Sequence, residues 1–117
     1  MNNKDTGNED SAIKIDNLSV NSTVKSPLII KGSARGSWFF EASFPVKLVD
    51  GENNIIASGI AMATANSLTE DFVPFEVKLE FNNQEKKKGV IVFKNDNPSG
   101  MLENDVYYRI PVIIDAN

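Results

Sequence analysis

The chain has 117 residues, which is enough for one domain with its own core and too few for two ordinary domains. It contains 16 Asp and Glu against 12 Lys and Arg, and the resulting net charge of −4 argues against nucleic acid and anionic membrane surfaces as partners. Cysteine and histidine are absent, which excludes disulfides, thiol nucleophiles and imidazole bases, and no apolar run is long enough to span a membrane.

Residues 1–12 differ in composition from the rest of the chain. They contain no large apolar side chain except Met1, so this segment cannot bury enough surface to offset the entropy lost on ordering. They also lack the apolar stretch of a signal peptide. The sequence therefore predicts a flexible tail or linker over residues 1–12 and one folded domain over residues 13–117.

From residue 13 onward, apolar residues recur at every second position, which is the spacing of half-buried β-strands. In residues 75–81, apolar side chains alternate with Glu, Lys and Glu, so one face of this strand is buried and the other is charged. Residues 62–71 are expected to form no more than a single helical turn. The pattern predicts seven short strands, over residues 13–20, 27–34, 44–48, 55–64, 75–81, 89–94 and 106–115.

Turn and edge residues add local detail to these strands. Asp50 and Gly51 form a pair that accepts positive φ, which predicts a turn between two strands. Gly32 indicates a bulge or a close neighbour. Pro111 cannot donate a hydrogen bond to a ladder, so the last strand is expected at a sheet edge or with a bulge at this position.

Seven short alternating strands in about 100 residues predict an all-β, immunoglobulin-like sandwich of two antiparallel sheets. A small closed barrel fits the same pattern and is the alternative fold. Because the chain has no cysteine, side-chain packing must replace the inter-sheet disulfide of antibody domains. The residues expected to supply this packing are Ile30, Trp38, Val46, Leu79 and Phe93.

The densest feature of the sequence lies between residues 32 and 46. Four aromatic residues occur from Trp38 to Phe44, beside one carboxylate, Glu41. This stretch resembles the immunoglobulin-like domain of bacterial spore germination, and the resemblance extends over residues 13–115. The positions that carry it are residues 24–28, Gly32, Ala34, Gly36, Trp38, Glu41, Ala42, Val46, Leu48 and Asp50, followed by residues 72–75, the strand that starts at Gly89, and residues 97–100.

The resemblance implies a non-catalytic bacterial module of the cell envelope that lies outside the cytoplasm. Domains of this kind occur in lipoproteins and membrane-anchored proteins. The family has no established ligand site that could be carried over to residues of this chain.

The candidate interaction or structural motif consists of Arg35, Trp38, Phe39, Phe40 and Glu41. Three consecutive aromatic residues cannot all face one side of an extended strand. We expect Trp38 and Phe40 to point into the core and Phe39 to be the better candidate for exposure.

Glu41 lies directly after these rings. We expect its carboxylate to accept backbone hydrogen bonds or to pair with Arg35 or Arg109. The alternative is a carboxylate tuned for acid catalysis.

Candidate catalytic and metal-binding groups are scattered along the chain. A glycosidase needs a second carboxylate opposite the first, and no spacing links Glu41 to Asp50, Glu52, Asp71 or Asp96. Residues 50–53 and 95–97 are rich in possible calcium ligands, but neither segment has the spacing of a calcium loop, and both suit ordinary turns. We therefore expect no enzyme activity, no metal site and no cofactor.

Residues 85–88, with the sequence Glu-Lys-Lys-Lys, form a small basic cluster. We expect this cluster to be a solvated hairpin tip that keeps neighbouring strand edges soluble. Contact with an anionic polymer or a phospholipid head group is the alternative.

The sequence therefore predicts a rigid scaffold that presents a sheet face or loops to a partner. Our first hypothesis is a protein of the cell envelope, bound through a sheet edge or an aromatic patch around Phe39. The second is a wall polysaccharide such as peptidoglycan, bound by rings that stack on sugars.

Overall fold

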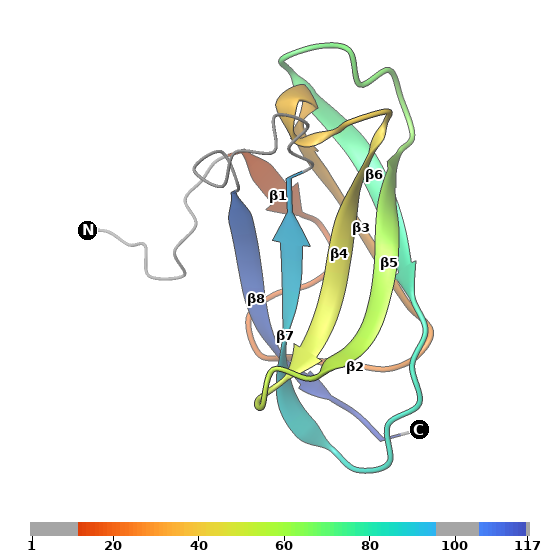
Figure 1. Ribbon diagram of the computed structural model, residues 1–117, viewed down its shortest axis with the longest axis vertical. Helices are drawn as coiled ribbons and strands as arrows, with labels where there is room; N and C mark the ends of the chain where they lie inside the picture. Colours follow the sequence, from red (N-terminus) through yellow and green to blue (C-terminus); the bar gives the residue numbers. More distant parts are fainter. Residues whose placement is uncertain (1–11, 96–105, 117) are drawn as a thin grey trace, which may run out of the picture.

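The computed structural model describes residues 12–95 and 106–116 (Figure 1). The predicted tail over residues 1–12 lies outside this part of the chain, apart from Ala12. In the described segments we find strands and one short 3₁₀-helix, η1, and no α-helix. The elements are β1 (Ile13–Ile15), β2 (Ser22–Val24), β3 (Leu28–Arg35), η1 (Gly36–Trp38), β4 (Ser43–Asp50), β5 (Ile55–Ala63), β6 (Phe72–Leu79), β7 (Lys87–Lys94) and β8 (Tyr107–Ile114).

The strands form one eight-stranded sheet in the order β1-β3-β6-β5-β4-β7-β8-β2. All neighbours are antiparallel except β2 and β8, which are parallel. The sheet curls so that β3 and β6 lie behind β4 and β5 in Figure 1. The all-β prediction is confirmed.

Two separate sheets, as predicted, are not confirmed, because β5 joins the two layers. This strand pairs with β4 along most of its length, and at its end Met62 and Ala63 pair with Glu76 and Phe75 of β6. The pairing of the described residues leaves β1 and β2 as the two edges of the sheet, so the strands do not close into the alternative barrel.

The strand predicted over residues 13–20 is limited to β1, and a second short strand that was not predicted, β2, follows at residues 22–24. β1 pairs with β3, and the chain then crosses to the other edge of the sheet, where β2 pairs with β8. Between them, Asn21 adopts a positive φ of 66°, which breaks the extended conformation. The structure therefore has eight strands instead of seven.

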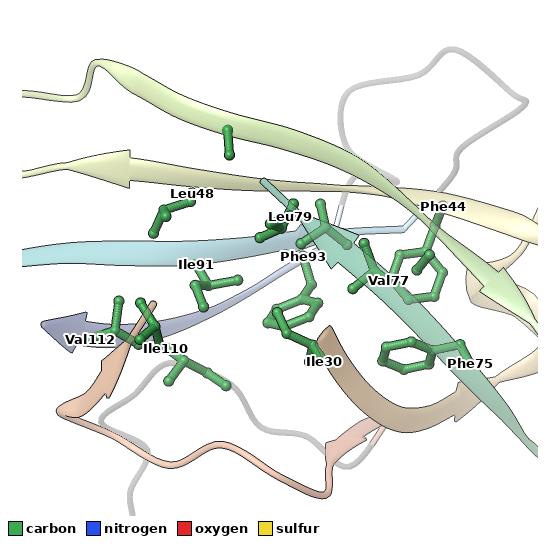
Figure 2. Close-up of a cluster of buried hydrophobic side chains, with 14 of the residues drawn as sticks. Ile30, Phe44, Leu48, Phe75, Val77, Leu79, Ile91, Phe93, Ile110 and Val112 are labelled. Atoms are coloured by element: carbon green, nitrogen blue, oxygen red, sulfur yellow. The ribbon is translucent and has the colours of Figure 1, made fainter. Parts of the chain in front are cut away.

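The core lies between the two layers of the curled sheet (Figure 2). The ring of Phe75 on β6 contacts Phe44 on β4 and Phe93 on β7, with centroid distances of 5.0 Å and 6.5 Å. The core residues expected from the sequence are all buried, namely Ile30, Trp38, Val46, Leu79 and Phe93. Because the core-facing residues alternate with outward ones on β4, β6 and β7, the period-two pattern predicted them correctly.

The predictions for the turn at Asp50 and for Gly32 are confirmed, whereas the prediction for Pro111 is wrong. The Asn53 N–H donates to the Asp50 carbonyl at 2.9 Å in a turn between β4 and β5. A Cβ at Gly32 would fall on the Lys14 carbonyl oxygen of β1, so the close neighbour expected at this glycine is present. Pro111 lies on β8 between β7 and β2, with no bulge in its pairing with β7, and its carbonyl accepts the Asn21 N–H at 2.7 Å. Proline is tolerated because its backbone groups face away from β7, so no hydrogen bond to β7 is lost.

Candidate functional site

The three aromatic residues after Gly36 do not continue a strand. Residues Gly36–Trp38 form η1, in which the Phe39 N–H donates to the Gly36 carbonyl at 3.0 Å. Successive side chains of a 3₁₀-helix point about 120° apart instead of alternating between two faces. The strand-based assignment of these rings to opposite faces therefore no longer applies.

The resulting positions of the three rings differ from the prediction in one respect. Trp38 is 3% exposed and stands edge-on to the core residue Phe44 at 5.3 Å, so its predicted burial is confirmed. Phe39 is half-buried and packs on Phe44 at 5.2 Å. Phe40 is 45% exposed, so its predicted place in the core is wrong. Phe40, and not Phe39, is the most exposed of the three rings.

A tight turn follows Phe40. The backbones of Phe40 and Ser43 exchange two hydrogen bonds, of 3.0 Å and 3.2 Å, and the intervening Glu41 and Ala42 have φ values of 54° and 68°. Positive φ at both central residues is the signature of a type I′ turn, which favours Asn-Gly. The left-handed conformation costs an L-residue roughly 1–2 kcal/mol, so this turn holds Glu41 and Ala42 in place at an energetic cost.

A second loop, over residues 64–71, packs against η1. A Cβ at Gly36 would fall on the Thr69 carbonyl oxygen, so only glycine allows the two backbones to approach this closely. The Gly36 N–H donates to the Asp71 carbonyl at 3.1 Å. Arg35 donates from Nη1 to the Glu70 carbonyl at 3.2 Å. These contacts fix the loop relative to the 40–43 turn.

Arg35 also stacks on an aromatic ring. Its guanidinium lies 4.6 Å from the centroid of the Phe72 ring, at the start of β6. Together with its bond to the loop backbone, this contact makes Arg35 a residue that positions the 64–71 loop.

The turn and the loop enclose a shallow, mainly apolar depression of about 570 Å³. Leu68 is 90% exposed and Phe40 is 45% exposed, and both line the depression. Its lining consists of Gly36, Phe39, Phe40, Glu41, Ala42, Ala65, Asn66, Ser67 and Leu68.

Glu41 does not make the ion pairs predicted for it. The residue is exposed, and the ion pairs between described residues do not include it. Arg35 binds the Glu70 carbonyl instead, and the Arg109 guanidinium lies 4.9 Å from the centroid of the Tyr107 ring. The prediction assumed a half-buried charge in need of a partner, whereas solvent reaches Glu41 on the turn.

The Asp50 carboxylate acts as a turn cap. Its Oδ1 accepts the N–H groups of Glu52 and Asn54, both at 2.9 Å, and its Oδ2 lies 3.8 Å from Lys87 Nζ. The hydrogen bond from the Asn54 backbone, followed by smaller contributions from the Asn54 amide, the Glu52 N–H and the Lys87 charge, lowers the pKa of Asp50 below its ordinary value of 3.8.

Residues 96 and 97 of the second oxygen-rich segment lie outside the described residues, as does the candidate carboxylate Asp96. Within residues 12–95 and 106–116, no group of three His, Cys, Asp or Glu residues lies close enough to hold a metal ion. In the same residues, no helix is long and apolar enough to cross a membrane.

Sequence reasoning missed the loop that completes the depression. Residues 64–71 are polar except for Ala65 and Leu68, and a single large apolar residue in such a loop is the signal that could have identified Leu68. Its proximity to Phe40 could not be predicted, because it depends on the contact between Gly36 and Thr69.

The sequence model of the immunoglobulin-like domain of bacterial spore germination matches residues 12–101. No curated protein and no solved structure gives a significant match. The matched region spans the described strands from β1 to β7, together with the aromatic turn and the 64–71 loop. The chain therefore belongs to the family of immunoglobulin-like domains of bacterial spore germination.

Proposed function

We propose that this domain is a non-catalytic binding module of the bacterial cell envelope, located outside the cytoplasm, that docks a protein partner in the depression between the 40–43 turn and the 64–71 loop. The observation that carries the proposal is the exposure of Phe40 and Leu68 on the lining of one depression. The location rests on the resemblance to the family and is part of the proposal.

Large apolar side chains on rigid supports are suited to protein recognition. Aromatic anchors dominate binding energy when a partner buries them, and a preorganised site loses less entropy on association. Here the Gly36 backbone contacts Thr69 and Asp71, and the Ala63 N–H donates to the Ala42 carbonyl at 2.8 Å. Both sides of the depression are therefore held in place by the sheet.

The acidic groups favour binding over catalysis. Glu41 is the one carboxylate among the residues that line the depression, whereas acid–base hydrolysis of a glycosidic bond requires two. The sequence has neither histidine nor cysteine to act as a base or nucleophile.

The test uses the domain immobilised and exposed to detergent-solubilised envelope protein from the source bacterium. We expect Phe40→Ala and Leu68→Ala each to reduce the amount of the captured partner at least about tenfold, which corresponds to about 1.4 kcal/mol. Ile55→Ala is the matched control, because Ile55 is 58% exposed at the opposite end of β5. Equal capture by wild type and both variants would contradict the proposal, as would an equal loss with Ile55→Ala.

Carbohydrate binding is the second candidate, because the exposed Phe40 ring shares the depression with the polar side chains of Glu41 and Asn66. An aromatic face flanked by hydrogen-bonding groups is suited to a sugar ring. Titration with soluble peptidoglycan fragments separates the two candidates. A sugar site requires binding that Phe40→Ala abolishes and Leu68→Ala retains, and absence of binding to the wild type rejects this candidate.

A further inference from the structure

The outward side of β4, β7 and β8 carries cations without acidic residues. Core-facing and outward positions alternate along these strands, and the outward ones include Lys47, Lys88, Lys94 and Arg109. No Asp or Glu occupies an outward position within these three strands. Lys47 and Arg109 are both in register with Val92, so they flank it about 10 Å apart. We call this surface the basic face.

The outward face of β3 and β6, in the other layer of the curled sheet, differs because it includes an acidic residue. Lys31 Nζ lies 3.7 Å from Glu76 Oε2 across these two strands. The ion pairs between described residues do not include Lys47, Lys88 or Arg109 of the basic face. The basic face is therefore a local positive surface on a chain with a net charge of −4.

Among the residues that the structure describes, no strand pairs with the outer edge of β8, which borders the basic face, over half its length. β2 covers β8 only at residues 112–114, and the Asn21 N–H extends this cover to the Pro111 carbonyl. The Asp115 N–H, just after β8, donates to the Val24 carbonyl of β2 at 2.9 Å. Because backbone groups alternate between the two sides of a strand, the odd-numbered residues of β8 direct their N–H and C=O groups away from β7. By this alternation, Tyr107 and Arg109 direct N–H and C=O groups outward, where the described strands provide no partner.

Near the opposite edge of the sheet, the outer side of β3 is covered. β1 pairs with residues 32–34 of β3. Beyond β1, the Asn17 side chain accepts the Lys31 N–H at 2.9 Å and donates to the Ile29 carbonyl at 2.8 Å, which replaces the contacts of a neighbouring strand. Exposed edges are usually covered in this way, so an uncovered edge is a candidate docking position.

We propose that an extended acidic segment of a partner protein adds to the sheet at residues 107–110 of β8, in line with β2. The backbone groups of Tyr107 and Arg109 provide the hydrogen bonds of strand addition. The basic face determines the sign of charge that the added strand must carry.

The alternation of β8 also specifies the side-chain pattern of the partner. Outward positions of an added strand lie next to Arg109, whose guanidinium is held over the Tyr107 ring, and a carboxylate there would pair with this cation. Positions on the other face lie next to Tyr108, which is half-buried, and Ile110, which is 3% exposed. The segment should therefore alternate acidic and apolar residues.

The experiment titrates the full chain, labelled with nitrogen-15, with a blocked hexapeptide of sequence Gly-Glu-Val-Glu-Val-Gly and follows the amide resonances. We expect the Tyr107 and Arg109 amides to shift, binding to weaken as salt increases, and the Lys-Val counterpart to cause no shift. Arg109→Ala should weaken binding about tenfold or more. Lys31→Ala, on the outward face of β3, should change the binding less than twofold.

A pair of variants isolates the backbone contribution. Tyr107→Pro and Tyr107→Ala both remove the ring, but only proline also removes the outward N–H. Strand addition predicts clearly weaker binding of the hexapeptide to the proline variant, whereas equal binding would overturn the proposal. Phe40→Ala should leave the binding of the hexapeptide unchanged. Failure of the strand-addition proposal can therefore be distinguished from failure of the proposed binding in the depression.

Other occupants would also overturn the proposal, and each has its own signature. Binding to phosphatidylglycerol vesicles without any response to the hexapeptide would indicate a lipid surface. Shifts of the Tyr107 and Arg109 amides that depend on protein concentration, without peptide, would indicate a second copy of this chain.

Discussion

Trp38 and Phe40 are separated by one residue, yet Trp38 is 3% exposed and Phe40 is 45% exposed. In a strand their side chains would share one face. Because η1 ends at Trp38 and a tight turn begins at Phe40, the first ring enters the core and the second lines the depression. One short aromatic run thus contributes both to folding and to the candidate binding surface.

The first prediction concerns the stability of these two positions. Trp38→Ala should lower the free energy of unfolding by about 3–5 kcal/mol, because it leaves a cavity next to Phe44. Phe40→Ala should lower it by less than about 1 kcal/mol. Urea denaturation of the two variants measures both, and similar losses would contradict the assignment of one ring to the core and the other to the surface.

The second prediction concerns the contact between η1 and the 64–71 loop. Gly36→Ala should lower the free energy of unfolding by about 1–3 kcal/mol, because the new methyl group meets the Thr69 backbone, which cannot rotate away as a side chain could. Gly51→Ala is the control, since a Cβ at Gly51 meets nothing within 4 Å, and should change stability by less than about 0.5 kcal/mol. Thermal or urea unfolding of the pair tests this, and equal stability would show that the loop does not pack on Gly36.

The third prediction concerns the strained turn. Ala42→Gly should raise the free energy of unfolding by about 0.5–1 kcal/mol, because glycine removes the cost of the left-handed conformation but loses more entropy on folding. Asn53→Gly provides the comparison, since Asn53 has a φ of 70° but asparagine accepts this conformation more easily. Asn53→Gly should therefore raise the free energy of unfolding by less than Ala42→Gly. A destabilised Ala42→Gly variant would contradict the proposed strain.

The fourth prediction concerns pH. The pKa of Asp50 is lowered in the folded state, chiefly by the Asn54 N–H, so its ionised form stabilises the fold above pH 3.8 and this contribution disappears as the pH falls through the folded pKa. Asp50→Asn should therefore be less stable than wild type at neutral pH. The difference in the free energy of unfolding between the two proteins should become smaller in strong acid. Unfolding curves from pH 7 to about pH 2 measure this. Glu52→Gln is the control, and a gap for Asp50→Asn that is independent of pH would refute the role of its charge.

The sequence was sufficient to predict features that depend on local alternation or turn chemistry. Apolar residues at alternate positions identified Phe75, Val77 and Leu79 as core residues of one strand, and all three are buried. The Asp50 turn also follows from properties of the residues themselves.

Features that depend on distant contacts could not be predicted. β2 is three residues long and exists through its pairing with β8, which is far away in the sequence. The exposure of Phe40 depends on η1, which in turn packs against Thr69. The single curled sheet depends on the pairing between the end of β5 and Glu76 of β6, which no local pattern indicates.

The most direct test of the account compares tryptophan fluorescence at the two positions. Trp38 is the only tryptophan of the chain, so the variant with Trp38→Phe and Phe40→Trp moves the reporter from the core to the depression. The account predicts blue-shifted emission protected from acrylamide for wild type, and red-shifted, readily quenched emission for the double variant, provided that its circular dichroism matches wild type. Equal protection from acrylamide at both positions would contradict the account.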